Sequence, residues 1–117
     1  MTERRGIKPI TSSTFYILLA LVDEPRHGLG IAAEIESRTD GEVCMGPGTL
    51  YNGIKKMLDS NLIVEASTRP APEEDDPRRR YYRITKGGRA ALEAEAAKLE
   101  RLMVAARDKQ VLTDSSA

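Results

Sequence analysis

Residues 46–58 read GPGTLYNGIKKML, which marks the start of a helix. Gly46 can serve as the N-cap, and Pro47 suits the first helical position because proline has no N–H to satisfy there and its φ is already helical. Apolar residues then recur three and four positions apart, at Leu50, Ile54, Met57 and Leu58. We therefore predict a helix from Pro47 to about Ser60 that packs one side against a core.

The other side of this helix is short, polar and mostly cationic. Gly48 and Gly53 have no side chains, so we expect the helix backbone to be closely approachable on this side. Tyr51 stands at the border of the apolar stripe. The polar residues opposite the stripe are Thr49, Asn52, Lys55, Lys56 and Asp59. Most charged helical positions are simply solvated, so this face taken alone would be interpreted as solvent-exposed surface.

The size and composition of the chain predict a single helix-rich domain with an appendage. The chain has 117 residues, of which 40% are apolar and 4% aromatic, so its core should be aliphatic. The longest apolar run, Phe15–Val22, is too short to span a membrane, and no signal-peptide pattern precedes it. Together with the single cysteine, Cys44, these features predict a cytoplasmic protein with no membrane partner.

Two helices are predicted before the one that begins at Pro47. The first is capped within residues 11–13 and runs to about Val22; it is apolar nearly all round, as a central core helix is. The second runs from about Gly28 to Arg38 and covers the first from one side.

A β-hairpin is predicted after the three helices. Residues 62–67 and 80–85 are rich in β-branched and aromatic residues and too short for helices, and a Pro-rich acidic stretch separates them. Alternation along the second strand places Tyr82 in the core and Tyr81 on the outward face.

Charges are separated by segment, although the formal net charge is zero. Residues 73–76 are all acidic, whereas residues 77–92 contain no acid and six basic residues: Arg78, Arg79, Arg80, Arg83, Lys86 and Arg89. Because contacts to phosphate dominate nucleic-acid affinity, this distribution matters more than the sum. The alternative is that the arginines pair with the acids of the same loop.

A last helix is predicted from the cap Thr85 to about Lys109. Its apolar seam has the spacing of a coiled coil and comprises Leu92, Ala96, Leu99, Met103 and Ala106, widened by Leu102. A helix of ~25 residues is ~37 Å long, more than so small a domain can cover. We expect it to pair with a second subunit; alternatively it folds back on the first helix and leaves the protein monomeric.

The order of these elements is that of a mainly α fold with a small β-hairpin: a winged helix-turn-helix followed by a long C-terminal dimerisation helix. We predict a flexible arm over residues 1–10, a winged helix-turn-helix domain over 11–85, the dimerisation helix over 86–109 and a disordered tail over 110–117.

Five short stretches, taken together in their order and spacing, carry a resemblance to a known family: PRHGLGI (25–31), GTLY (48–51), KKML (55–58), NLI (61–63) and RRYYRITKGGR (79–89). Together they closely resemble the PadR family of bacterial transcriptional regulators, over about residues 12–108. The chain resembles the short subtype, which has one C-terminal helix. It departs from the family's usual pattern at Leu29, where an aromatic residue normally follows the His-Gly pair, and in the unusually acidic wing loop.

The resemblance implies a dimeric repressor that binds double-stranded DNA and occludes a promoter. Its recognition helix would be the one beginning at Pro47, with the low polar face toward the bases. The implied DNA-contacting residues are Thr49, Tyr51, Asn52, Lys55, Lys56, Arg78, Arg79, Arg80 and Tyr81. Asn52 would pair with an adenine edge and the lysines would read guanine or hold phosphate. The arginines would reach flanking phosphates or a neighbouring minor groove.

The resemblance also implies a homodimer interface and a ligand pocket. The predicted interface residues are Phe15, Leu92, Ala96, Leu99, Leu102, Met103 and Ala106. By analogy with the family, a small hydrophobic or aromatic effector would bind between subunits among Phe15, Leu18, Leu99 and Met103, where flexible methionine suits an adaptable ligand. Binding of this effector would release the repressor from DNA.

Two other classes of function compete with this one. A winged helix that binds protein instead of DNA would suit the neutral charge and the acidic wing, and would show no salt-dependent duplex binding. An enzyme is disfavoured because the sequence has no nucleophile–base pair, phosphate loop or metal-ligand cluster, and His27 is its only histidine. We therefore predict no cofactor and no bound metal.

Overall fold

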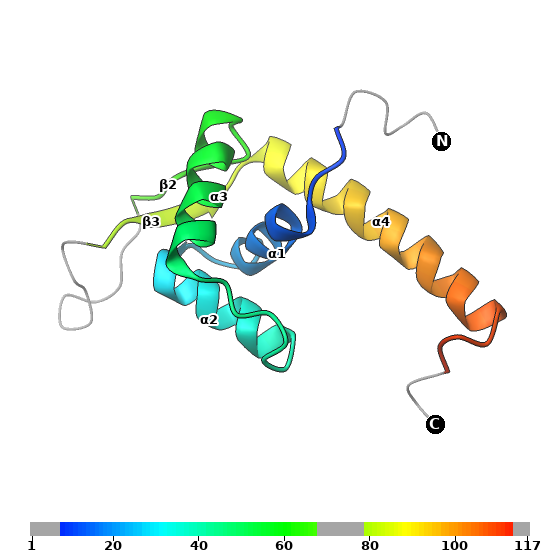
Figure 1. Cartoon of the computed structure of the whole chain (residues 1–117). Helices are drawn as coiled ribbons and strands as arrows, with labels where there is room; N and C mark the ends of the chain where they lie inside the picture. The colour runs from blue at the N-terminus through cyan, green and yellow to red at the C-terminus, as the bar shows by residue number, and fades with distance from the viewer. Residues whose placement is uncertain (1–7, 68–78, 114–117) are drawn as a thin grey trace.

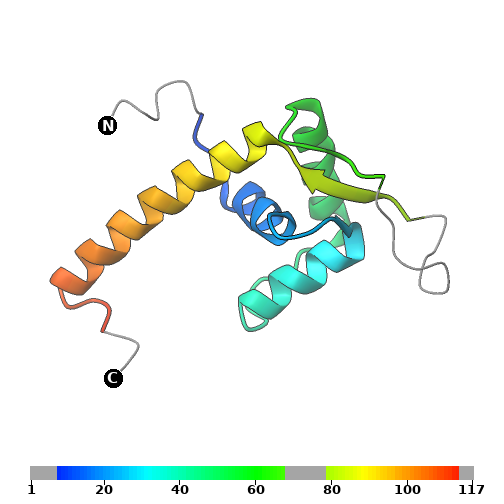
Figure 2. The same cartoon turned by 180° about the vertical axis from the view of Figure 1, so that it is seen from behind.

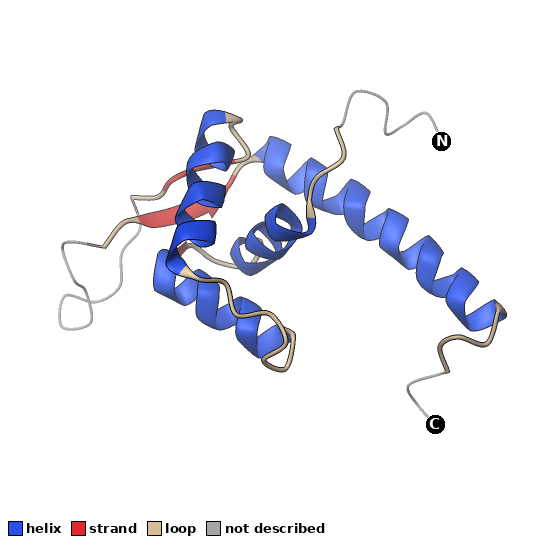
Figure 3. Cartoon of the chain, viewed as in Figure 1, coloured by secondary structure: helices blue, strands red, loops and turns tan. Residues whose placement is uncertain are grey.

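The computed structural model of the protein describes residues 8–67 and 79–113 (Figure 1). Its elements, in chain order, are α1 (Ser12–Leu21), β1 (Arg26–His27), α2 (Gly28–Arg38), α3 (Pro47–Asp59), β2 (Ile63–Glu65), β3 (Tyr81–Ile84) and α4 (Lys86–Asp108). Figure 3 shows helices accounting for most of the chain, with a small sheet beside α3. The predicted fold class, mainly α with a small β element, is confirmed. None of the described helices is both long and apolar enough to cross a membrane.

The helices begin where the local chemistry predicts. Thr11 and Thr85 each accept, through Oγ1, a hydrogen bond from the amide three residues further on, at 3.2 and 2.9 Å. The cap of α3 is Gly46, which makes no side-chain bond, and Pro47 follows at the first helical position. Each helix start is thus set by the few residues around it, which is why the sequence predicted it closely.

The sheet contains one strand more than the predicted hairpin. Its order is β1-β3-β2, with both pairs antiparallel. The strands β2 and β3 were predicted, whereas β1 was missed because two residues are too few to show an alternating pattern. This short strand places Arg26 beside Tyr82 and His27 beside Tyr81.

The prediction that Tyr81 reaches outward is wrong. Tyr81 and Tyr82 are both buried, at 8% and 7% exposed. The ring of Tyr81 lies edge-on to His27, its neighbour across the two strands, with ring centroids 5.2 Å apart and planes at 88°. The missed strand β1 therefore supplies the side chain that covers Tyr81.

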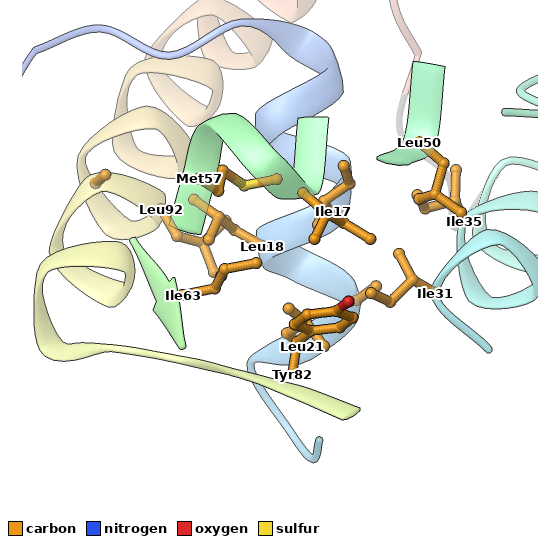
Figure 4. Close-up of a cluster of buried hydrophobic side chains, with 13 residues drawn as sticks. Ile17, Leu18, Leu21, Ile31, Ile35, Leu50, Met57, Ile63, Tyr82 and Leu92 are labelled. Carbon is orange, nitrogen blue, oxygen red and sulfur yellow. The ribbon is translucent and has the colours of Figure 1, made fainter. Parts of the chain in front are cut away.

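The hydrophobic core forms around α1, which contacts α2, α3 and α4 (Figure 4). Ile17 and Leu18 of α1 are fully buried, as are Ile31 of α2 and Ile63 of β2. Burying such side chains contributes roughly 1.5–3 kcal/mol each. Leu18 therefore cannot line a pocket between subunits in this conformation, and that prediction is corrected.

The first turns of α4 belong to this domain, whereas the rest of the helix extends away from it (Figures 1 and 2). Leu92 is 5% exposed and packs into the core of its own chain. Its prediction as a dimer-interface residue is therefore wrong, because the seam passes from the domain core to open surface along the helix. Beyond this point the apolar side chains are exposed.

The close approach of α4 to the strand β2 requires a glycine. A Cβ at Gly88 would overlap the carbonyl oxygen of Leu62 and lie 2.9 Å from the Ile84 side chain. The hydroxyl of Thr85 donates to the carbonyl oxygens of Asn61 and Leu62, at 2.7 and 3.0 Å. These contacts fix the direction in which α4 leaves the domain.

Candidate nucleic-acid interface

The helix α3 is anchored by one face and bare on the other. Leu50, Ile54 and Met57 are each 2% exposed, so the predicted apolar stripe is confirmed as the packed side. The predicted polar residues on the opposite side all lie exposed: Thr49, Asn52, Lys55 and Lys56. A Cβ added at Gly48 would meet no atom within 4 Å, so the first turn of α3 presents an open surface. Another macromolecule could approach this helix closely.

The cations on this face remain available for a partner. Lys55 is paired with Asp59 at 3.8 Å, but the two side chains are 77% and 71% exposed. Ion pairs this exposed contribute between about 0 and 1 kcal/mol and exchange readily. Lys55 can therefore leave this carboxylate for a phosphate or a base edge at small cost.

Tyr51 does not project straight out from α3 but lies over the start of α2. A Cβ at Gly28 would overlap the Tyr51 hydroxyl, so this approach requires glycine at position 28. Tyr51 nevertheless remains 47% exposed. The glycine of the His-Gly pair and the tyrosine of GTLY, 23 positions apart in the sequence, thus form one contact.

A cavity of about 240 Å³ opens where α2, α3 and the base of the wing meet. Its lining comprises His27, Gly28, Leu29, Tyr51, Arg79, Arg80 and Tyr82. Figure 1 shows the first turns of α2 and α3 near the outer end of β3. The exposed Tyr51 of α3 is one of the residues that line the cavity. The base of the wing and the predicted recognition helix are therefore neighbours.

The electrostatic environment of this cavity is positive. None of the described residues that line it is acidic, and two are arginines. Burial lowers the pKa of His27 below its ordinary value of 6.5, and the charge of Arg79 lowers it further. The Nδ1 of His27 accepts a hydrogen bond from the Gly30 amide at 3.2 Å and so caps α2. The neutral ring is the form that can accept this bond.

The distal half of α4 carries a second exposed surface, which is apolar. Leu99, Leu102 and Met103 are 38%, 59% and 43% exposed. Of the other predicted interface residues, Ala96 is exposed, whereas Ala106 and Phe15 are half-buried. Exposed apolar side chains clustered in this way are typical of surfaces that a partner covers.

The predicted ligand pocket is present only in part. Phe15 and Leu99 line one cavity of about 180 Å³ together with Ser12, Tyr16 and Glu95. Met103 is not among the residues that line it, and Leu18 is buried in the core. The structure of one chain thus brings two of the four predicted residues together.

Comparisons with known proteins identify the family of this chain. A family model described as the transcriptional regulator PadR-like family matches residues 17–94, more than half of the chain. The protein belongs to the PadR family. Its members are transcriptional regulators and not enzymes, so this chain is a transcriptional regulator.

The chain is also similar to individual proteins and to solved structures. It is 36% identical, over 86 residues and 74% of its length, to an uncharacterised 37.1 kDa protein in transposon TN4556 of Streptomyces fradiae, but spans only 22% of that protein. It is 33% identical to an uncharacterised protein of Lysinibacillus sphaericus, over 65% of this chain and 67% of that one. The fold of a PadR family transcription regulator from Clostridium difficile covers 86% of this chain and 99% of that one, with a TM-score of 0.67 at 24% identity.

In this PadR chain, some of the predicted DNA-contacting residues meet at one surface. Arg79 and Arg80 lie at the base of the wing beside Tyr51, whereas Arg78 lies outside the described residues. Tyr81 is buried and does not share this surface. Sequence reasoning missed Gly28, Leu29 and Tyr82 as lining residues, since their proximity depends on how α2, α3 and β3 pack. The His-Gly pair was the only local signal that could have pointed to them.

Proposed function

We propose that this PadR regulator is a sequence-specific DNA-binding repressor that occludes a promoter. The observation that carries the proposal is α3 itself, which is docked by three fully packed apolar residues and bare and cationic on its other face. A helix of this kind fits the major groove, where it presents hydrogen-bonding side chains to base edges. The adjacent arginines at the base of the wing supply contacts to backbone phosphates.

Each side chain on this surface has a role that its chemistry allows. The carboxamide of Asn52 is the group that pairs with the N6 and N7 edge of adenine. Lys55 and Lys56 suit guanine O6 and N7 or a phosphate, and the hydroxyl of Thr49 suits a phosphate or contacts a thymine methyl through its own methyl group. Arg79 and Arg80 approach the phosphates that flank the groove.

The repressor acts as a homodimer in this proposal. Two recognition helices must be about 34 Å apart to enter successive major grooves, which one chain cannot provide. The exposed apolar side chains of α4, with Leu102 at 59% exposed, supply the surface that a second copy would cover. Two-fold pairing of this surface buries the same residues in both chains.

DNA binding is tested with the full chain and a labelled duplex taken from upstream of its own gene, beside a scrambled duplex, at two salt concentrations. We expect tight binding to the first duplex alone, weakening steeply as salt rises. Lys55→Ala should weaken specific binding by ~1–3 kcal/mol if it reads a base, or reduce the salt slope by about one if it touches phosphate. Lys109→Ala, at the far end of α4, is the matched control and should bind as the parent does.

If no duplex is bound, including duplexes selected from a random pool, the DNA-binding proposal is refuted. The protein-binding winged helix then becomes the better account, and the zero net charge favours it. Equal affinity of Lys55→Ala and parent on every duplex would remove only Lys55 from the interface.

Effector release is proposed at the cavity lined by Phe15, Tyr16 and Leu99. Its apolar walls with the Glu95 carboxyl nearby would admit a small hydrophobic molecule, a cationic one in particular. Calorimetry with hydrophobic cations and phenolic acids should show heat for a true effector, and the same compound should lower operator affinity. No heat across the panel, with unchanged operator affinity, would dismiss this pocket.

A further inference from the structure

We propose that the cavity at the start of α2 is a phosphate site, with Tyr82 as an inner hydrogen-bond donor and Arg80 as the outer charge. The favoured source of the phosphate is the DNA backbone, so this inference rests in part on the proposed function. It assigns a ligand to Tyr82, which the sequence predicted to be a core residue, and it gives Tyr51 a role in shaping the site.

Tyr82 is the observation that points to a ligand. It is 7% exposed, yet within the described residues its hydroxyl has no hydrogen-bond partner. Every fully buried side-chain nitrogen or oxygen in the described part of the chain does have a partner, so this hydroxyl is not sealed in the core. Tyr82 lines the cavity, and Tyr51, which lines it too, is among the groups that raise the pKa of the Tyr82 hydroxyl. Figure 4 shows the ring among the core residues, with its oxygen directed toward the side of Ile31 in α2.

The rest of the lining is suited to an oxyanion. The first amides of a helix have no intrahelical partner, and the helix dipole makes that end positive. His27 satisfies the amide of Gly30, while Gly28 and Leu29, the first two residues of α2, face the cavity. Arginine guanidinium groups are strong phosphate donors, and Arg79 and Arg80 close the outer side.

The size and charge of the cavity fit a phosphate better than an apolar molecule. At about 240 Å³ it could hold roughly eight waters, which is ample for a phosphate group and part of its hydration shell. Glu65 is the cross-strand neighbour of Tyr82. Burial raises the pKa of Tyr82, the charge of Glu65 raises it further, and the charge of Arg80 lowers it. The hydroxyl of Tyr82 is thus protonated at neutral pH and is a donor to an anion.

A phosphate held here would fix the position of α3 on the duplex. Tyr51 comes from the second turn of α3 and forms one wall of the site, against Gly28 of α2. A backbone phosphate between them would therefore set how far along the groove the base-reading side chains lie. Contacts of this kind position a protein on DNA without reading sequence directly.

Two pairs of variants test the site in the full chain. Tyr82→Phe removes only the hydroxyl, and Ser37→Ala, which removes an exposed hydroxyl near the C-terminal end of α2, is its control. Gly28→Ala displaces the exposed Tyr51 ring, whereas Gly30→Ala meets only ordinary contacts at 3.6 Å or more. Urea unfolding shows that each variant is folded before its binding is measured.

Binding is measured on a duplex selected from a random pool, with neutral methylphosphonates replacing its phosphates one at a time. We expect one position per half-site at which neutralisation weakens the parent about tenfold or more. Tyr82→Phe and Gly28→Ala should weaken binding to the unmodified duplex by a similar factor. For these two variants, neutralising the phosphate at that position should cause no further loss of affinity. Both control variants should behave as the parent does.

The second arm titrates inorganic phosphate and follows the Leu29 amide by NMR. If the parent binds DNA but the variants match it and phosphate leaves this amide unmoved, the phosphate site is overturned and the repressor function stands. If phosphate moves the amide in the parent but not in Tyr82→Phe, while DNA affinity is unchanged, the site is supported with a free phosphate as its source. If the parent binds no duplex, the proposed function fails and this titration alone decides the site.

Discussion

Replacing Gly88 by alanine should loosen the joint between the winged domain and α4. The added Cβ would overlap a backbone oxygen, that of Leu62, and backbone cannot move aside as a flexible side chain can. The start of α4 would have to retreat from the strand β2. Gly87→Ala is the matched control, because there the nearest atoms lie at 3.7 and 3.8 Å, which is ordinary contact.

The magnitude follows from the contacts that hold this joint. Retreat of α4 would stretch the Thr85 hydroxyl bonds to Asn61 and Leu62, at 2.7 and 3.0 Å, and the Thr85 amide bond to Leu62, at 3.0 Å. Losing these hydrogen bonds should lower the free energy of unfolding by about 2 kcal/mol. Replacing glycine by alanine in a helix should raise it by up to ~1 kcal/mol. Gly88→Ala should be less stable than the parent by at least about 1 kcal/mol. Gly87→Ala should be equal to it or more stable by up to ~1 kcal/mol.

Urea unfolding followed by far-ultraviolet circular dichroism measures both free energies. All samples are compared at one protein concentration, because association of two chains would add to the apparent stability. At a slope of ~1–3 kcal/mol/M, a difference of about 2 kcal/mol between the two variants separates their midpoints by roughly 1 M. A Gly88→Ala midpoint at or above that of Gly87→Ala would refute the account of a close backbone contact at this position.

Two further predictions follow from burial and from the helix cap. Leu92→Ala should destabilise the fold by ~2–5 kcal/mol because the Leu92 side chain is in the core. Leu102→Ala should leave the unfolding free energy of the isolated chain within about 0.5 kcal/mol of the parent, because the Leu102 side chain is exposed. It should instead weaken dimerisation, which analytical ultracentrifugation measures. The pKa of His27 in the folded state lies below 6.5, so the unfolded state binds more protons than the folded state as pH falls past 6.5. The free energy of unfolding should therefore be level above pH 6.5 and decline below it. His27→Asn, which keeps a capping acceptor, should lack this decline in urea midpoints measured from pH 8 to 5. An unchanged pH profile in His27→Asn would assign the decline to other groups.

Local chemistry explains why the helices could be predicted from the sequence. Pro47 and Thr85 act on amides within their own first turn, so the signal and its effect lie three residues apart. The apolar stripe of α3 likewise has its period within one element. Predictions that rest on such short distances agree with the structure.

The errors all involve contacts between residues far apart in the chain. The burial of Tyr81 depends on β1, which pairs with β3 across more than 50 positions and is too short to be recognised by pattern. The approach of Tyr51 to Gly28 depends on the packing of α3 against α2. The candidate phosphate site combines both, since its lining comes from the starts of α2 and β3 and from α3. Its residues could be named from the sequence only in part for this reason.

The seam of α4 shows why periodicity alone could not separate core from interface. Leu92 and Leu99 occupy the same stripe, one heptad apart, yet the first is 5% exposed and the second 38%. The two leucines differ in exposure because the domain ends between them along α4. The contacts of Thr85 and Gly88 determine this point, because they fix the direction in which α4 leaves the domain. The same anchor that places Leu92 in the core therefore projects Leu99 and Met103 beyond it. Weakening the joint should alter both the stability of the domain and the relative positions of the two recognition helices in a dimer, so Gly88→Ala is expected to lower operator affinity even at concentrations where the chain remains folded.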